Sequence, residues 1–96
     1  MSEWPPIPAH VDSALGPVAV EVVADLEDMG EFDPHARIIR VRAGMHPAAA
    51  WQALCHERAH LVIWDSGLKL PGKSEEYVCD AVGVAMAMDV RRRGSL

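Results

Sequence analysis

The sequence has little of several things that would place a chain in a particular class of protein. Its 96 residues include only two cysteines, Cys55 and Cys79, too few for a disulfide-rich secreted scaffold. Both lie within apolar helical patterns, where a free cysteine behaves as a small hydrophobe, so we expect a reducing, cytoplasmic environment. Residues 1–8 carry acid and three prolines in place of a basic start and an apolar run, and no apolar stretch is long enough to span a bilayer. We therefore expect neither a signal peptide nor a membrane partner.

Basic side chains are also scarce. The chain has 9 lysines and arginines against 14 acidic residues, which gives a formal net charge of −5 and a pI near 5.4. Because phosphate binding needs a basic face, we expect no nucleic-acid partner. The one basic run is Arg91, Arg92 and Arg93, and we interpret it as a solvated helix end whose cations complement the helix dipole.

The apolar pattern predicts a single α+β domain over residues 1–96, in which a small N-terminal antiparallel sheet packs on a helix that is followed by a second helix. Residues 1–17 should form an extended N-terminal segment, with a short helical turn at 9–15. Residues 18–26 alternate as in a strand with one buried face, and a helix is the competing interpretation. Residues 29–32 and 37–42 predict the two strands of a hairpin, with Ile39 and Val41 on one face.

Two helices are expected in the C-terminal half. The first should begin near Pro47, which suits the first turn of a helix, and run to about Trp64 before Gly67 closes it. Residues 68–73 should form a loop, and Ser74 is a good N-cap for the second helix. Residues 94–96 should be loose. An apolar stripe at i, i+3, i+4 spacing marks the second helix: Val78, Ala81, Val82, Ala85 and Met86.

The string that carries chemistry is ALCHERAHL, residues 53–61, on the first predicted helix. His56 and His60 stand one helical turn apart, so both imidazoles project from one face and suit a single zinc ion about 2 Å from each nitrogen. Glu57 lies about 100° round the helix from His56, where its carboxylate can take a proton from a metal-activated water. Two half-exposed histidines on a helix surface are the alternative, but the string lies on a long amphipathic helix with apolar flanks.

A catalytic zinc site usually has three protein ligands and one open position, so one ligand is missing from this string. We expect Glu76, on the second helix, to be the third ligand. Asp80 lies on the same face and should accept the outer N–H of a ligand histidine, which would fix its tautomer. Glu75 is the alternative ligand, and favourable charge at a helix N-terminus would explain both glutamates but not Asp80. Asp65 is discounted, because it lies about 140° off the face of His60.

Two further roles stay open. Hydrolases with a catalytic zinc site usually supply a hydrogen-bond donor that stabilises the oxyanion, and the side chains available here are Tyr77, His35 and His46. For each of them an ordinary surface or half-buried side chain is the simpler interpretation. Cys79 lies three residues after Glu76 and could approach the metal, although a buried cysteine at a helix contact is the simpler interpretation.

These residues resemble the gluzincin metallopeptidases, which carry HExxH on one helix and a glutamate, followed four positions later by an acidic or amide residue, on the next. More closely, residues 18–88 resemble the short ImmA/IrrE-type peptidases of phages and mobile elements, in which two strands precede such helices. The resemblance implies a zincin-like fold, with His56, His60 and Glu76 as zinc ligands, Glu57 as the catalytic base and Asp80 in support.

We therefore expect a zinc-dependent metallopeptidase that acts on a protein or peptide. In zincin-like folds an edge strand above the cleft binds an extended peptide, and the strand at 37–42, which lacks proline, is the candidate. Two alternatives stay open: a metal-stabilised structural or protein-interaction module without turnover, and hydrolysis of another amide, such as one in peptidoglycan. Val84, Met86 and Met88 could leave an apolar patch, so dimerisation is a further hypothesis.

Overall fold

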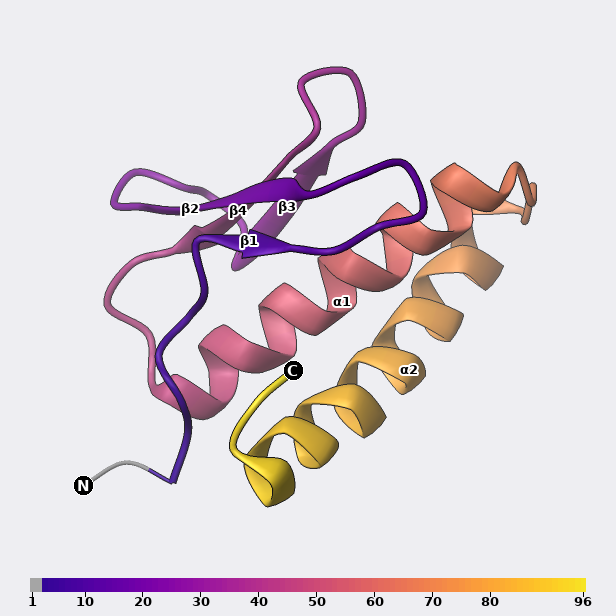
Figure 1. The fold of residues 1–96 in the computed structure, drawn as a ribbon. Helices are drawn as coiled ribbons and strands as arrows, with labels where there is room; N and C mark the ends of the chain where they lie inside the picture. Colours follow the sequence, from indigo (N-terminus) through magenta and orange to yellow (C-terminus); the bar gives the residue numbers. More distant parts are fainter. Residues whose placement is uncertain (1–2) are drawn as a thin grey trace.

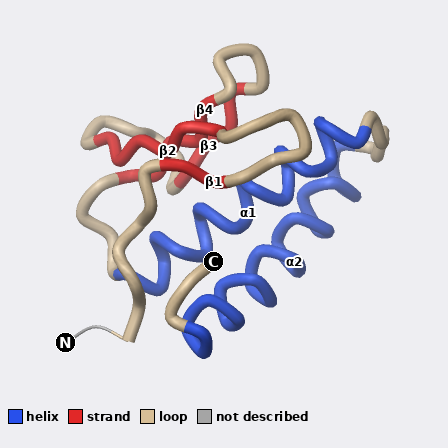
Figure 2. Tube along the Cα trace, in the orientation of Figure 1, coloured by secondary structure: helices blue, strands red, loops and turns tan. Residues whose placement is uncertain are grey.

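The computed structural model describes residues 3–96 and has three layers (Figure 1). A four-stranded sheet lies on one side of the first helix, and the second helix packs on the other side (Figure 2). Along the chain the elements are β1 (His10–Val11), β2 (Val18–Val23), β3 (Gly30–Asp33), β4 (Ile38–Arg42), α1 (Pro47–Ser66) and α2 (Gly72–Arg93). The predicted α+β class is confirmed.

The sheet is mixed, so the prediction of an antiparallel sheet was wrong. Its strand order is β1-β2-β4-β3, with β2 and β4 parallel and both outer pairs antiparallel. After β2 the chain forms β3 at the edge of the sheet and returns through a tight turn, so β4 enters the centre in the same direction as β2. Apolar alternation predicts strands and their buried faces, but it does not contain their order.

β3 and β4 form the predicted hairpin. Asp33 ends β3, and its Oδ1 accepts hydrogen bonds from two backbone N–H groups of the turn, at 3.1 and 3.0 Å. Arg37 completes the turn in the left-handed region, at φ 58°. Ile39 and Val41 of β4 share one face, as predicted, and that face is buried in the hydrophobic core.

Residues 9–15 contribute the short edge strand β1 and a turn, so the expected helical turn was wrong. Val11 is buried in the core, and pairing with β2 satisfies the strand backbone on that side. In the proline-rich segment before β1, the carbonyl of Pro5 accepts a 2.7 Å hydrogen bond from the indole Nε1 of Trp51. The first two positions of the expected N-terminal segment lie outside the described residues.

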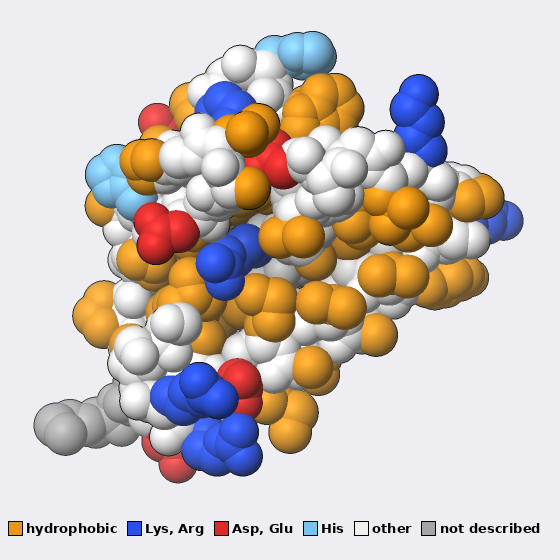
Figure 3. Space-filling model, turned by 45° about the vertical axis from the view of Figure 1, so that its right-hand side comes forward, with side chains coloured by type: hydrophobic (Ala, Val, Ile, Leu, Met, Phe, Trp, Pro, Cys, Tyr) orange, Lys and Arg blue, Asp and Glu red, His pale blue; other side chains and the backbone are white. Residues whose placement is uncertain are grey.

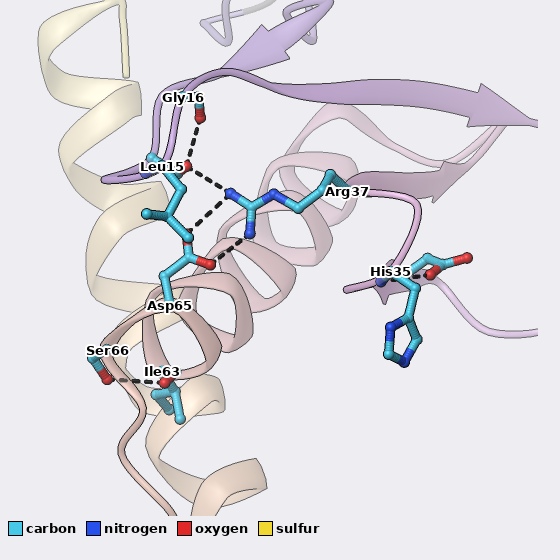
Figure 4. Close-up of polar contacts among 9 residues, drawn as sticks. Leu15, Gly16, His35, Arg37, Ile63, Asp65 and Ser66 are labelled. Atoms are coloured by element: carbon cyan, nitrogen blue, oxygen red, sulfur yellow. Dashed lines mark hydrogen bonds and ion pairs between the residues drawn. The ribbon is translucent and has the colours of Figure 1, made fainter.

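α1 begins at Pro47 and is closed by Gly67 in the left-handed region, both as predicted. Near its C-terminal end, the two carboxylate oxygens of Asp65 accept hydrogen bonds from the guanidinium of Arg37, at 2.5 and 3.1 Å (Figure 4). The same guanidinium donates to Ser13 Oγ at 2.8 Å. These bonds join the β3–β4 turn and the loop after β1 to the end of α1. The bond from Arg37 also holds the pKa of Asp65 below its ordinary value.

The N-cap of α2 lies three residues earlier than predicted. Pro71 precedes the helix, and Ser74 lies inside the first turn rather than at the N-cap. Because proline has no backbone N–H, it suits a place in front of a helix, where that donor would lack an intrahelical partner.

The apolar stripe predicted on α2 is not the face that packs on α1. Val78 and Val82 are 42% and 41% exposed. A Cβ added to Gly83 would lie only 2.9 Å from the backbone nitrogen of His56, so the two helices are in close contact there. The contact face consists mainly of small residues, and the buried ones are Cys79, Gly83, Ala87 and Val90.

Both helices expose large apolar side chains. Figure 3 shows hydrophobic side chains gathered over the helical side of the molecule, and Val84 and Met88 are among those exposed. Met86, which we expected in the same patch, packs against the core instead. Neither helix within residues 3–96 combines the length and hydropathy that crossing a bilayer requires.

Candidate metal centre

The predicted site residues come from two facing helices. α1 contributes His56, Glu57 and His60 from its middle, and α2 contributes Glu76 and Asp80 from its first half. Residues four positions apart in a helix lie one turn apart on the same face. The histidine pair of α1 and the acidic pair of α2 therefore face each other across the helix contact.

Three of these side chains meet at one point. Nε2 of His56 lies 3.1 Å from Nε2 of His60. The carboxylate of Glu76 spans both nitrogens, with Oε2 3.3 Å from His56 and Oε1 2.9 Å from His60. The three ligand atoms lie within 4.8 Å of one another, a spacing compatible with zinc bonds of about 2 Å to a shared ion.

A carboxylate of α2 also holds each imidazole at its second nitrogen. Asp80 Oδ1 lies 2.8 Å from Nδ1 of His56, and Glu75 Oε2 lies 2.6 Å from Nδ1 of His60. A proton on each Nδ1 would satisfy these carboxylates and leave each Nε2 with a lone pair directed at the other and at Glu76. The two Nε2 atoms and the Glu76 carboxylate would then be acceptors that converge with no donor between them. A cation satisfies such a group, so the chemistry of these residues fits a metal ion.

Glu57 lies beside these three groups rather than among them. Its Oε2 is 4.0 Å from Nε2 of His56, and only 11% of its side chain is exposed. Burial raises the pKa of this carboxyl above its ordinary value; the two histidines oppose the rise, and the carboxylates of Glu76 and Asp28 add to it. A raised pKa lies closer to neutral pH, where a side chain is most effective at both accepting and donating a proton.

β3 runs close to Glu57 because Gly30 has no side chain. A Cβ at Gly30 would lie 3.2 Å from Cγ of Glu57 and 3.3 Å from the carbonyl oxygen of Arg40. Both contacts are tighter than a Cβ normally makes. The glycine therefore allows an edge strand to pass directly beside the candidate base.

The site opens into a cleft of about 1360 Å³. Its walls are α1, the first half of α2, the loop between them and β3 with the loop that precedes it. Among the described residues, Arg42 and Lys69 are the basic side chains that line it, against seven acidic ones: Glu27, Asp28, Glu31, Glu57, Glu75, Glu76 and Asp80. The cleft exceeds the roughly 300–1,000 Å³ of a small-molecule pocket, so it has room for part of a polymer.

The three side chains that the sequence offered as possible oxyanion donors, all of them described residues, lie outside the cleft lining. Nδ1 of His46 caps α1 by accepting a 3.1 Å hydrogen bond from the N–H of Ala48. His35 lies in the hairpin turn, edge-on to Trp64 with ring centroids 5.9 Å apart. Tyr77 is 71% exposed. The cationic side chains that do line the cleft, Arg42 and Lys69, were not singled out by the sequence.

Both cysteines are free and buried. Burial raises the pKa of each thiol to about 11, so neither is a reactive thiolate at neutral pH. Cys55 belongs to the hydrophobic core, as its place in an apolar helical pattern predicts. Asp65 is held by Arg37 and takes no part in the site, also as expected.

The strand at 37–42 is not an edge strand, so the prediction that it binds a peptide was wrong. β4 lies between β2 and β3 and pairs with both. Its backbone donors and acceptors are therefore used within the sheet. The edge strand that lines the cleft is β3.

Glu75, which the sequence suggested as the alternative third ligand, lies outside the group formed by His56, His60 and Glu76. It lies against the outer nitrogen of His60 instead of joining Nε2 with Glu76. Adjacent positions on a helix differ by about 100° in direction, so neighbouring glutamates can contact opposite sides of one imidazole. Their spacing contained this signal, but only the helix–helix distance decides which glutamate reaches which nitrogen.

Comparisons with protein families, with curated proteins and with solved structures find no match to this chain. The chemistry of the site therefore rests on its own geometry.

Proposed function

We propose that this chain is a zinc-dependent metallopeptidase with a zincin-like site. The observation that supports this most directly is the meeting of His56 Nε2, His60 Nε2 and the Glu76 carboxylate beside the buried carboxyl of Glu57. The likeness of the two helices to those of the short ImmA/IrrE-type peptidases also supports it, and we propose that family.

In this proposal His56, His60 and Glu76 hold the zinc ion. Asp80 and Glu75 orient the two imidazoles through their Nδ1 atoms, so that both Nε2 atoms are free to bind. Zinc bound by two histidines and a glutamate supplies a Lewis acid for a carbonyl oxygen and lowers the pKa of a coordinated water.

Glu57 is the proposed general base. Its carboxylate accepts the proton of the attacking water and then delivers it to the leaving amide nitrogen. Burial, which raises the pKa of Glu57, makes its carboxylate a stronger base in the first transfer than an exposed glutamate would be. The same burial limits the access of bulk water to that proton.

We propose an extended peptide segment as the substrate. β3 ends the sheet, and within residues 3–96 no strand pairs with its outer side. Such an edge can bind a peptide as an added strand through backbone hydrogen bonds. Since Gly30 brings β3 close to Glu57, a peptide paired there would pass beside the base. This strand edge favours a peptide over a peptidoglycan amide.

The test combines metal analysis with cleavage of a peptide library. Purified protein should contain about one zinc per chain, and His56→Ala and Glu76→Ala should each lower that content. Glu57→Gln should keep the zinc and abolish chelator-sensitive cleavage. Glu27→Gln, which neutralises another carboxylate of the cleft wall, is the matched control and should keep both.

Three results would count against this assignment. Cleavage retained in Glu57→Gln would remove its role as base. Bound zinc without cleavage of any peptide would favour a metal-stabilised interaction module. Protein without zinc would mean that a proton on one imidazole, rather than a metal, satisfies the converging nitrogens.

A further inference from the structure

The second buried cysteine differs from the first in its surroundings. Cys55 is part of the hydrophobic core, whereas Cys79 lies at the contact of α1 with α2, outside that core cluster. It is fully buried and stands one helical turn after Glu75. Residues one turn apart share a face, so its sulfur and the Glu75 carboxylate are directed toward the same part of α1.

That part of α1 carries His60. A ring nitrogen of His60, a carboxylate oxygen of Glu75 and Sγ of Cys79 all lie within 4.8 Å of one another. Nδ1 is the ring nitrogen that faces this group, because it lies 2.6 Å from Glu75 Oε2. The opposite nitrogen, Nε2, is directed at Glu76.

We propose that His60 Nδ1, Glu75 and Cys79 form a second cation site, for a sulfur-binding divalent ion such as Zn²⁺ or Cd²⁺. One nitrogen, one oxygen and one sulfur ligand suit such ions and disfavour Mg²⁺ and Ca²⁺, which bind oxygen. Three protein ligands leave one position open for water. The inference concerns binding alone and stands whether or not the first site cleaves peptides.

Binding at this site changes two proton positions. The Cys79 thiol releases its proton to solvent when the sulfur becomes a thiolate ligand. Nδ1 of His60 gives up its proton as well, which moves to Nε2 beside Glu76 when the first site is empty and to solvent when that site holds an ion. Glu75 changes from a hydrogen-bond acceptor to a ligand. The carboxylates near Cys79 favour a cation there, and Glu75, with 28% of its side chain exposed, gives solvent access.

The two sites are coupled because they use opposite nitrogens of the same imidazole. An ion at the second site breaks the hydrogen bond between Glu75 and His60, and Nδ1 of His60 binds the ion instead. An excess of a sulfur-binding cation therefore acts on the first site through His60. The first site contains no sulfur ligand, which gives the two sites different spectra.

The test is a Co²⁺ titration of the full chain, kept reduced without an added thiol and followed by absorbance. Wild type should develop a near-ultraviolet sulfur-to-cobalt charge-transfer band. Cys79→Ser should lose the band, and Cys55→Ser, the matched control at the other buried cysteine, should keep it. Glu75→Gln should need at least about tenfold more Co²⁺ to reach half of the maximal absorbance of the band.

Glu76→Ala separates this site from the first one. It removes a ligand of the first site only, so the charge-transfer band should persist in that variant. Circular dichroism melting of each variant shows whether it is folded, and Glu75→Gln, at a partly exposed position, keeps the test decisive if Cys79→Ser does not fold.

Saturable Co²⁺ binding to wild type without the band would overturn the proposal and leave the first site intact. A band that depends on Cys55 instead of Cys79 would overturn it as well, and so would a band unaffected in both Cys79→Ser and Glu75→Gln. A band that persists in a protein with no peptidase activity would support this inference while the proposed function fails.

Discussion

Gly83 controls how closely the two site helices approach, and Gly83→Ala tests that directly. In the interior of α2, alanine should stabilise the helix by about 0.8–1.0 kcal/mol relative to glycine. At this position, however, the added Cβ would lie 2.9 Å from the nitrogen and 3.0 Å from the Cα of His56. Both obstacles are backbone atoms, which cannot rotate away as the end of a side chain can.

The steric term should exceed the gain in helix propensity. Carbon atoms in contact prefer separations of about 3.5–4.0 Å, so the helices must separate locally by about half an ångström. Overpacking of this kind costs about 1–3 kcal/mol. After the gain in helix propensity is subtracted, the net loss in the free energy of unfolding is up to about 2 kcal/mol, and each kcal/mol lowers Tm by about 4–8 °C in a domain of this size.

The assay is thermal unfolding of metal-free protein followed by zinc titration, with Gly72→Ala as the matched control. A Cβ at Gly72, the first residue of α2, meets nothing within 4 Å, so this variant should be neutral or slightly more stable. Gly83→Ala should melt lower and also bind zinc more weakly, because His56 moves relative to Glu76. A Gly83→Ala protein as stable as Gly72→Ala would refute the argument that this contact sets the helix spacing.

Three further predictions follow from the contacts described. Asp65→Asn should lower Tm at neutral pH, because Arg37 depresses the folded-state pKa of Asp65. The Tm difference from wild type should be full above pH ~4, the ordinary pKa in the unfolded chain, and should shrink as the pH falls through the folded-state pKa. A Tm difference that grows on acidification would contradict this. Trp51→Phe removes the hydrogen bond to Pro5 from a buried side chain and should cost about 1–3 kcal/mol in urea unfolding; an unchanged midpoint would show that the N-terminal segment does not need this bond. Zinc at 100 times its Kd should raise the free energy of unfolding by about 2.7 kcal/mol, reversibly with a chelator, and a Tm insensitive to zinc would mean that the folded chain does not bind it.

The sequence was most informative where a structure is set by neighbouring residues. Pro47 and Gly67 predicted both ends of α1, because fixed φ and left-handed backbone are properties of single residues. The hairpin of β3 and β4 followed from two short predicted strands separated by a turn. The spacing of His56 and His60 predicted a shared face by helical periodicity alone, and their Nε2 atoms are indeed adjacent.

Predictions failed where a structure depends on which surfaces meet. On α2 the sequence suggested a stripe that includes Val78 and Val82, yet the helix turns the small residues Cys79 and Gly83 toward α1. Hydrophobicity ranks valine above glycine as a buried residue, but two helices in close contact need small side chains between them. The apolar pattern of one helix does not show how closely a second helix approaches.

The amino-acid sequence by itself determined the helices, the hairpin and the pair of histidines on one face, because hydrogen bonding and side-chain direction within a segment are local. Tertiary structure alone decided that β2 and β4 are parallel and that β3, not β4, is the edge strand beside the cleft. It also decided that Asp80 contacts the imidazole of His56, whereas Glu75 contacts that of His60. These features depend on distances between segments far apart in the chain, which packing of the whole core sets and local periodicity does not contain.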